Sequence, residues 1–417
     1  MAINPNHRWK VLAVGVAANV SFSSVVGGLP AAAVYMRDTY HLDTAQLGVV
    51  LGVLGLGIAV SEIPWGLLTD RWGDRRILLT GLFSSAMALI GLALLSALVP
   101  TALVLAMGLF AVGLLGSSVN GASGRAIMVW FSERERGFAM SIRQTAVPGG
   151  YALGAIVLPW LAHAYGFVQV FAVAATGCVL AGLFAWAWLL ESGLAAFPMT
   201  SGPDPSPLRD PGVWRMVLAI SLLCVPQFTI LTYAAVFFHD VGPVDIAVVS
   251  AVLAIIQVGA IIGRIWSGRW TDRHRNRLSY LTMCAWLSAL SFLTLGLTVS
   301  AINASGLNTS AYAMALIILV MVAAGICVSV WHGVAYTELA SLAGASRAGT
   351  ALAMGNTAVF VALFLTPVTV SVLLSQASWC GVWLAAASCA LATVPMFSRA
   401  ERLQPRQSTP VSGAVED

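Results

Sequence analysis

A few ionisable side chains interrupt the long apolar stretches of this chain, and these are the residues that could do chemistry. Glu62, Arg125, Arg143 and His332 each lie inside a stretch that is otherwise apolar. An ionisable side chain at membrane depth is costly unless it is paired or in contact with water. A carboxylate or imidazole there can take up and release a proton, and an arginine can pair with an anion. The chemistry that these residues indicate is proton transfer and ion pairing, not bond cleavage.

Each of these residues also has a structural interpretation. Arg125 either pairs with Asp70 or Glu62 in an inner gate or binds an anionic substrate, and its depth favours the gate. Arg143 begins a helix beside a polar loop, so it either extends to water or contacts an anion. His332 is either a neutral packing residue or a proton carrier. We therefore treat Glu62, Arg125 and His332 as candidates for proton coupling or gating.

Other polar and aromatic residues in the apolar stretches are candidates for lining a substrate cavity. Each of them alone could make an ordinary hydrogen bond between helices. As a set they indicate a mostly apolar cavity with few polar groups, which would take most of its affinity from apolar surface. The candidates are Asn19, Asn120, Arg143, Gln144, Gln227, Tyr233, Gln257, Trp331 and Asn356.

The elements that must position these residues are membrane-spanning helices. Apolar residues make up 59% of the 417 residues and charged residues only 9%, too few charges for a water-soluble surface. About 20 mostly apolar residues are needed to cross a bilayer as a helix. Twelve such stretches can be marked, at 9–36, 46–68, 77–98, 102–131, 138–162, 167–190, 215–238, 244–267, 279–300, 311–336, 348–374 and 379–397.

A charged phrase occurs twice and divides these stretches into two sets. Residues 66–76 read GLLTDRWGDRR, and residues 268–277 read GRWTDRHRNR, 202 positions later. A second pair of matching segments, 136–147 and 348–359, lies 212 positions apart. The sequence therefore predicts two similar halves. We expect a six-helix bundle over 1–190, a linker over 191–214, a second six-helix bundle over 215–397 and a tail over 398–417.

The distribution of arginine and lysine predicts the orientation. One side of the predicted membrane holds almost all of these residues outside the spans, whereas the other side holds only Arg37. The positive-inside rule then places both termini in the cytoplasm, in a multi-pass protein of the cytoplasmic (inner) membrane.

The repeated phrase resembles the G-x-L-x-D-R-x-G-x-R-R motif of the major facilitator superfamily. The resemblance implies two bundles around a central cavity that opens alternately to each side. It also implies a gating role for the motif, in which the aspartate either pairs with arginines or faces a helix N-terminus. The motif residues are Gly66, Asp70, Arg71, Gly73, Arg75 and Arg76 in the first copy and Gly268, Asp272 and Arg273 in the second.

We expect a secondary transporter and not an enzyme. The sequence has no G-x-x-x-x-G-K-[ST] phrase, catalytic triad or metal cluster, so no cofactor or metal is expected and a proton gradient supplies the energy. The six cysteines fall in apolar segments and are interpreted as small hydrophobic residues. The expected partners are the lipid bilayer, a small molecule and protons, without nucleic acid, and the protein is expected to work as a monomer.

Three functions remain open at this point. Proton-coupled export of a small amphipathic compound, such as a drug or a siderophore-like metabolite, is favoured by the sparsely charged cavity. A partial match of residues 147–154 to an antiporter motif adds slight support for export. Proton-coupled import of a small organic anion is the alternative, because of Arg125 and Arg143. A membrane sensor or scaffold without transport is the third, and it would normally carry a soluble domain that this sequence lacks.

Overall fold

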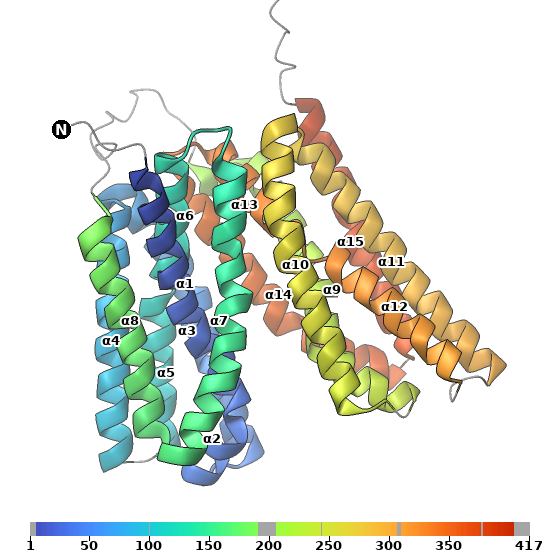
Figure 1. Ribbon diagram of the computed structural model, residues 1–417, viewed down its shortest axis with the longest axis horizontal. Helices are drawn as coiled ribbons and strands as arrows, with labels where there is room; N and C mark the ends of the chain where they lie inside the picture. The colour runs from blue at the N-terminus through green and yellow to red at the C-terminus, as the bar shows by residue number, and fades with distance from the viewer. Residues whose placement is uncertain are drawn as a thin grey trace, which may run out of the picture.

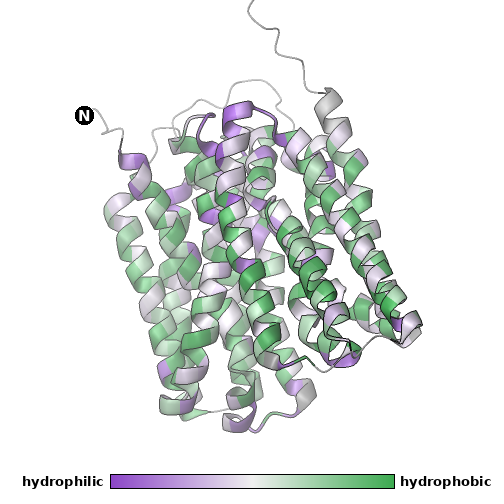
Figure 2. Ribbon diagram, turned by 45° about the vertical axis from the view of Figure 1, so that its right-hand side comes forward, coloured by the Kyte–Doolittle hydropathy of each residue, from purple (hydrophilic) through white to green (hydrophobic). Residues whose placement is uncertain are grey.

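The protein is a bundle of helices, and the expected all-α fold with twelve spanning helices is confirmed. The computed structural model describes residues 6–99, 101–190, 206–242, 244–306, 310–376 and 378–403, which form helices and no strand. Twelve helical segments among them are long and apolar enough to cross a membrane. In Figure 2 hydrophobic residues run along the sides of the helices, and hydrophilic residues gather at the upper end.

The first half of the molecule is defined here as α1 to α8. In this half α1 packs along α7, α3 along α5, and α4 along α8. Helices α1 and α7 approach closely because Gly28 lies against the backbone of Gly154, where any larger side chain would collide. The helices are α1 (His7–Ala31), α2 (Ala33–Thr39), α3 (Thr44–Trp72), α4 (Asp74–Leu98), α5 (Ala102–Gly116), α6 (Ser118–Trp130), α7 (Arg136–Tyr165) and α8 (Phe167–Trp188).

The second half is defined as α9 to α15, and it repeats much of this arrangement. Here α9 packs along α14 and α15, α11 along α15, and α10 along α12. A short 3-10 turn, η2 (Pro207–Arg209), precedes it. The helices are α9 (Pro211–Val241), α10 (Ile246–His274), α11 (Arg277–Ser305), α12 (Ala311–Cys327), α13 (His332–Ala343), α14 (Ala348–Gln376) and α15 (Trp379–Leu403).

The fourth span of each half is broken, although the sequence predicts continuous helices over 102–131 and 311–336. In the first half α5 and α6 are separated at Ser117, whose hydroxyl bonds back to the carbonyl of Leu114. In the second half the break lies at residues 328–331, and α13 continues to Ala343. The first break lies three residues before the candidate Asn120, and the second lies directly before the candidate His332.

The two halves meet at one end of the bundle, which we call the motif end because both charged phrases lie there. It carries the turns at 72–76, 131–136, 273–277 and 344–347. Contacts between the halves pair α3 with α14 and α7 with α10. Figure 1 shows α7 and α10 close together at the upper, motif end and farther apart at the lower end.

The predicted boundaries of the two bundles, the linker and the tail stay predictions. Residues 191–205 of the predicted linker and 404–417 of the predicted tail lie outside the described residues. At the edges that are described, α9 begins at Pro211, four residues before the predicted bundle, because Asp210 caps it by accepting from the backbone N–H of Gly212 at 2.7 Å. Helix α15 extends to Leu403, past the predicted end at 397.

Candidate functional site

Asp70 joins the two halves at the motif end. Its carboxylate accepts hydrogen bonds from the backbone N–H groups of Gly349 (2.9 Å) and Thr350 (2.8 Å) and from the Thr350 hydroxyl (2.6 Å). These donors are the first residues of α14, where unpaired N–H groups and the helix dipole favour a negative charge. Asp70 therefore caps a helix of the opposite half.

Arg125 holds the Asp70 carboxylate in place from within the first half. Its Nε lies 3.3 Å from Asp70 Oδ1, and one terminal nitrogen donates to Asp74 Oδ1 at 3.0 Å. Asp74 is the first residue of α4 and is almost completely buried. Arg125 therefore pairs with acids of the motif turn, the structural interpretation that its depth favours, and its role in gating stays a prediction.

Asp272 makes the equivalent contact in the opposite direction. Its carboxylate accepts from the backbone N–H groups of Gly137 (3.1 Å) and Phe138 (2.8 Å), at the N-terminus of α7. Arg277 pairs with it at 2.9 Å and also donates to the backbone carbonyl of Glu133 at 3.0 Å. The two aspartates and their helix N-termini form what we call the outer layer of contacts between the halves.

The glycines of the motif serve close approach and turn geometry. Gly66 lies against Gly349, and Gly268 lies against Gly137 and Ser141, so neither position has space for a side chain. Gly73 has φ of +90° in the turn between α3 and α4. The counterpart of Gly73 is Arg275, which keeps a positive φ of 52° despite its side chain.

The remaining arginines of the motif lie toward the surface. Arg71, Arg76 and Arg273 are exposed, and Arg75 donates to the backbone carbonyl of Trp186 at 3.0 Å. Their positions suit contact with lipid headgroups or water at the membrane edge.

Glu62 lies two turns deeper and also joins the halves. One carboxylate oxygen accepts from the Asn120 amide at 2.6 Å, and the other accepts from the Asn356 amide at 3.3 Å. Asn120 belongs to α6 of the first half and Asn356 to α14 of the second. The Asn356 carbonyl oxygen in turn accepts from the Tyr336 hydroxyl at 2.7 Å. Eight residues of helix separate Glu62 from Asp70, which is about 12 Å along the axis.

Arg143 is buried within the first half, where it holds polar groups of α1 and α6. It donates to the backbone carbonyl of Asn120 at 2.6 Å, to Ser123 at 3.1 Å and to the Asn19 amide oxygen at 3.3 Å. Its side chain is 2% exposed, so it does not extend to water as the sequence interpretation allowed. The same contacts bring Asn19 and Asn120 close to the Arg143 guanidinium.

Arg264 is the buried cation of the second half. It donates to the backbone carbonyls of Ser329 at 2.7 Å and of Gln144 at 3.0 Å, and the second of these contacts crosses between the halves. Its other terminal nitrogen lies 3.3 Å from Nδ1 of His332. A ring protonated on both nitrogens would be positive and in contact with the Arg264 guanidinium, which disfavours His332 as a proton carrier.

Glu62 and Arg264 occupy equivalent positions in the two halves, each four residues before the first glycine of the motif. Glu62 contacts Asn120 and Asn356, whereas Arg264 contacts the residues at the matching positions, His332 and Gln144. We call this set, together with Arg143, which donates to Asn120, the inner layer. Matching positions of the repeat are in contact in both halves, but Glu62 and Arg264 carry opposite charge and their contacts differ, because Glu62 accepts from side-chain amides and Arg264 donates to backbone carbonyls.

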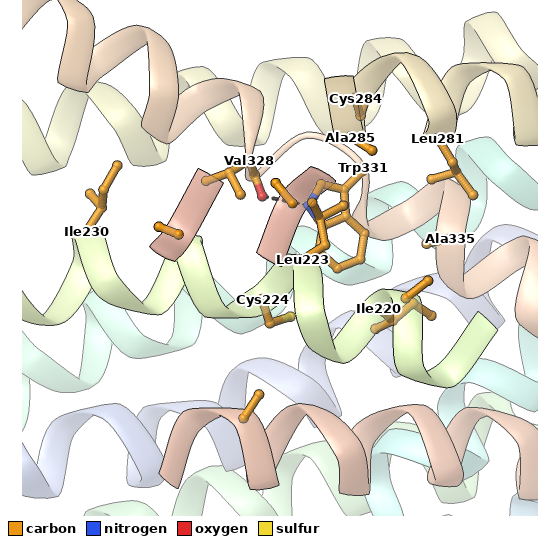
Figure 3. Packing of buried hydrophobic residues seen from close by; sticks show 14 of the residues in the cluster. Ile220, Leu223, Cys224, Ile230, Leu281, Cys284, Ala285, Val328, Trp331 and Ala335 are labelled. Atoms are coloured by element: carbon orange, nitrogen blue, oxygen red, sulfur yellow. Dashed lines mark hydrogen bonds between the residues drawn. The ribbon is translucent and has the colours of Figure 1, made fainter. Parts of the chain in front are cut away.

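The other cavity candidates are not brought to the inner layer by the contacts observed. Gln227 is buried in α9, Gln257 is half-buried in α10, and the Tyr233 hydroxyl donates to the backbone carbonyl of Pro367 at 3.1 Å. The placement of Trp331 on a cavity stays a prediction. Its indole is fully buried in the hydrophobic core against α9 and α11, and it donates to the carbonyl of Val328 at 2.6 Å (Figure 3).

Sequence reasoning missed Arg264, Tyr336 and Thr350. Arg264 could have been found by adding the repeat offset of 202 to Glu62. Tyr336 lies at the edge of the predicted span, and Thr350 contributes an ordinary hydroxyl. No sequence signal distinguishes these two from other polar residues.

The sequence is similar to known transporters over most of its length. Residues 14–315 match the family described as the Major Facilitator Superfamily. An uncharacterised MFS-type transporter of Mycobacterium tuberculosis is 26% identical over 391 residues, 93% of this chain and 84% of the relative. A probable galactarate/D-glucarate transporter of Bacillus subtilis is 30% identical over 134 residues, 32% of this chain and 30% of the relative.

Solved structures share the fold. The proton:xylose symporter XylE, bound to 6-bromo-6-deoxy-D-glucose, superposes with a TM-score of 0.77 at 15% identity, covering 95% of this chain and 96% of that chain. FucP in its outward conformation gives a TM-score of 0.73 at 14% identity, covering 94% and 99%.

Proposed function

Because this chain belongs to the major facilitator superfamily and is a secondary transporter of the membrane, we propose that it carries a small organic anion inward together with a proton. The observation that carries this proposal is the unbalanced positive charge of the inner layer. Arg143 and Arg264 are both buried there, and Glu62, which is linked to Arg143 through Asn120, is the acid of this layer in the described residues. One bound anion would balance the layer.

The other buried acids of the spans are already engaged in the outer layer. Asp70 and Asp74 share Arg125, and Asp272 and the buried Glu338 lie 2.9 and 4.0 Å from Arg277. Their charges therefore do not offset those of the inner layer. A buried charge that lacks a counter-ion is costly at membrane depth, so binding of an anion there is favoured.

Arg264 has the chemistry to bind a carboxylate. A guanidinium presents its N–H groups in a planar fork that matches the two oxygens of a carboxylate. At present those donors are directed at two backbone carbonyls and the His332 ring. A carboxylate is a stronger acceptor than a neutral carbonyl, so a substrate anion would compete well for this side chain.

Export of an amphipathic compound, the first expectation from the sequence, is less well supported than uptake of an anion. That expectation assumed a cavity with few fixed charges, and it did not include Arg264. The name of one relative, a probable galactarate/D-glucarate transporter, favours an acid, and the names of two fold neighbours, which are proton symporters, favour uptake with a proton.

The orientation of the cycle follows from the arginine distribution. If the motif end faces the cytoplasm, as the positive-inside rule predicts, the outer and inner layers close the cytoplasmic side. The conformation described here is then outward-facing. Uptake requires that both layers open after the substrate and the proton have entered from the far end.

The test is uptake by purified protein in proteoliposomes, with radiolabelled D-glucarate and galactarate as probes and neutral D-xylose for comparison. With an acidic exterior we expect accumulation of an acid and not of xylose. Arg264→Gln should reduce it at least about tenfold, the scale of one lost charged hydrogen bond. Arg134→Gln, which changes an exposed arginine at the motif end, should leave it unchanged.

Two results would overturn the proposal. One is accumulation of xylose in preference to the acids. The other is accumulation of the acids by Arg264→Gln at the rate of the unaltered protein.

A further inference from the structure

Among the described residues two polar contacts join the halves at mid-depth, and both come from equivalent positions of the repeat. In one, Glu62 Oε2 accepts from the Asn356 amide at 3.3 Å. In the other, Arg264 Nη1 donates to the backbone carbonyl of Gln144 at 3.0 Å. We call them the acid latch and the arginine latch. Opening of the motif end must break both, because each joins a helix of one half to a helix of the other.

The hydrogen-bond directions of the acid latch make it sensitive to a proton. The Tyr336 hydroxyl donates to the carbonyl oxygen of Asn356, so the amide nitrogen of Asn356 faces Glu62. An amide nitrogen donates and does not accept. If the Glu62 oxygen at this position were protonated, its O–H group and the amide N–H group of Asn356 would both be donors and could not bond to each other. The contact would then be lost, unless the Asn356 amide turned over and gave up its bond from Tyr336.

The proton is expected on the oxygen that faces Asn356. That oxygen accepts one bond of 3.3 Å, whereas the other accepts the shorter bond of 2.6 Å from Asn120. The longer bond is the weaker one, so replacing it costs less. Protonation therefore breaks the contact between Glu62 and Asn356, which joins the halves, and keeps the contact between Glu62 and Asn120 within the first half.

The surrounding charged groups leave Glu62 as the proton-sensitive group of this layer. On the α7 side Arg143 reaches it through Asn120, and on the α13 side Tyr336 reaches it through Asn356. On its own helix and on α6, Asp70 and Arg125 are paired in the outer layer. In the second half His332 faces Arg264, which opposes its protonation.

The arginine latch responds to a different ligand. A carboxylate that binds Arg264 takes donors that now go to the carbonyl of Gln144. Protonation of Glu62 also removes one negative charge from the layer, which strengthens the attraction of Arg143 and Arg264 for an anion. By linkage, the bound anion favours the proton to the same degree.

We propose that Glu62 is the proton-binding residue of the transport cycle and that proton and substrate each release one of the two latches. This inference rests on the proposed function for the arginine latch but not for the acid latch. When only a proton is bound, the contact between Arg264 and Gln144 remains. When only an anion is bound, the contact between Glu62 and Asn356 remains. The motif end opens readily only when both are bound, which couples the two flows in symport.

The test measures the opening of the motif end without any substrate. Nitroxide labels are placed by Lys10→Cys and Ser346→Cys, exposed positions in opposite halves, with the half-buried Cys327, Cys380 and Cys389 replaced by alanine. Pulsed electron-electron resonance in nanodiscs then gives the ratio of open to closed protein at pH 8 and pH 5. The absence of substrate makes the result independent of the transport test above.

At pH 8 we expect Glu62→Gln and Arg264→Met each to raise the open-to-closed ratio about tenfold, the scale of one charged hydrogen bond. The double variant should raise it about a hundredfold, because the two latches act independently. Acidification should shift the unaltered protein toward the Glu62→Gln ratio and should not shift Glu62→Gln further. Glu133→Gln, which changes an exposed acid at the same end, should respond to pH like the unaltered protein.

Three results would overturn the inference. They are a Glu62→Gln ratio equal to that of the unaltered protein at pH 8, a full response to pH in Glu62→Gln, and no response to pH in the unaltered protein. If Glu62→Gln does not reach the membrane, Asn356→Ala replaces it, since it removes the donor across the halves and keeps the acid. A closed Asn356→Ala at pH 8 would contradict the acid latch equally.

Discussion

The Asp70 contact with α14 should decide how long the motif end stays closed, and Asp70→Asn tests this. The carboxylate accepts three hydrogen bonds from Gly349 and Thr350, and its side chain is only 12% exposed. Asparagine keeps one acceptor oxygen and turns an NH₂ group toward donors. It also removes the negative charge at the helix N-terminus and beside Arg125.

The size of the effect can be worked from these losses. One charge-assisted hydrogen bond contributes about 1.5–3 kcal/mol, and the charge at a helix N-terminus contributes about 0.3–1 kcal/mol. Asp70→Asn should therefore destabilise the closed state by about 2–4 kcal/mol. At about 1.4 kcal/mol for each factor of ten, the open-to-closed ratio should rise roughly 30- to 700-fold.

The assay is the maleimide labelling rate of the thiol introduced by Ser141→Cys. Ser141 belongs to α7 and is fully buried against Gly268 and Gly333 of the second half, so the introduced thiol reacts when the motif end opens. Asp210→Asn is the matched control, because Asp210 caps α9 within one half and accepts from Gly212 and Val213.

We expect Asp70→Asn to raise the labelling rate by the calculated factor, to abolish net transport and to leave the protein in the membrane. Asp210→Asn should leave the rate unchanged. A rate for Asp70→Asn within twofold of that of the unaltered protein would refute the role of this contact in holding the halves together.

Three further predictions concern orientation, turn geometry and coupling. Reporter fusions after Arg37 and after Arg277 should report opposite sides of the membrane, and the same side for both would make the span map wrong. Gly73→Val should reduce transport at normal membrane abundance, because φ of +90° strains a branched residue by about 1–3 kcal/mol; wild-type uptake would exclude this. His332→Asn should keep the pH dependence of uptake, since Nδ1 lies 3.3 Å from the Arg264 guanidinium, whose charge disfavours a positive ring; loss of that dependence would restore His332 as a proton carrier.

The twelve spans could be predicted from the sequence because a bilayer requires long apolar helices. The breaks at Ser117 and at 328–331 could not, because each lies within a stretch that is apolar and long enough to cross the membrane as one span. The extension of α13 to Ala343 was missed for a related reason. Residues 336–343 include Thr337 and Glu338, whose polarity ends an apolar window although the helix continues.

The contacts between the halves were the least predictable feature. The sequence indicated that Asp70 could face a helix N-terminus, but the partner lies 280 residues away in Thr350. Glu62 and Asn356 are 294 residues apart, and their contact depends on how one half is turned against the other. Arg264 is different, because the repeat in the sequence already shows that it occupies the position equivalent to Glu62.

The central claim is that an organic anion and a proton move in the same direction. It is tested most directly by a pH-sensitive dye enclosed in proteoliposomes with equal pH on both sides, to which D-glucarate or galactarate is added outside. We predict acidification of the interior as the acid enters with protons, and no acidification with Arg264→Gln. Alkalinisation of the interior would show that protons leave as the acid enters, and the exchange that export requires would then replace symport.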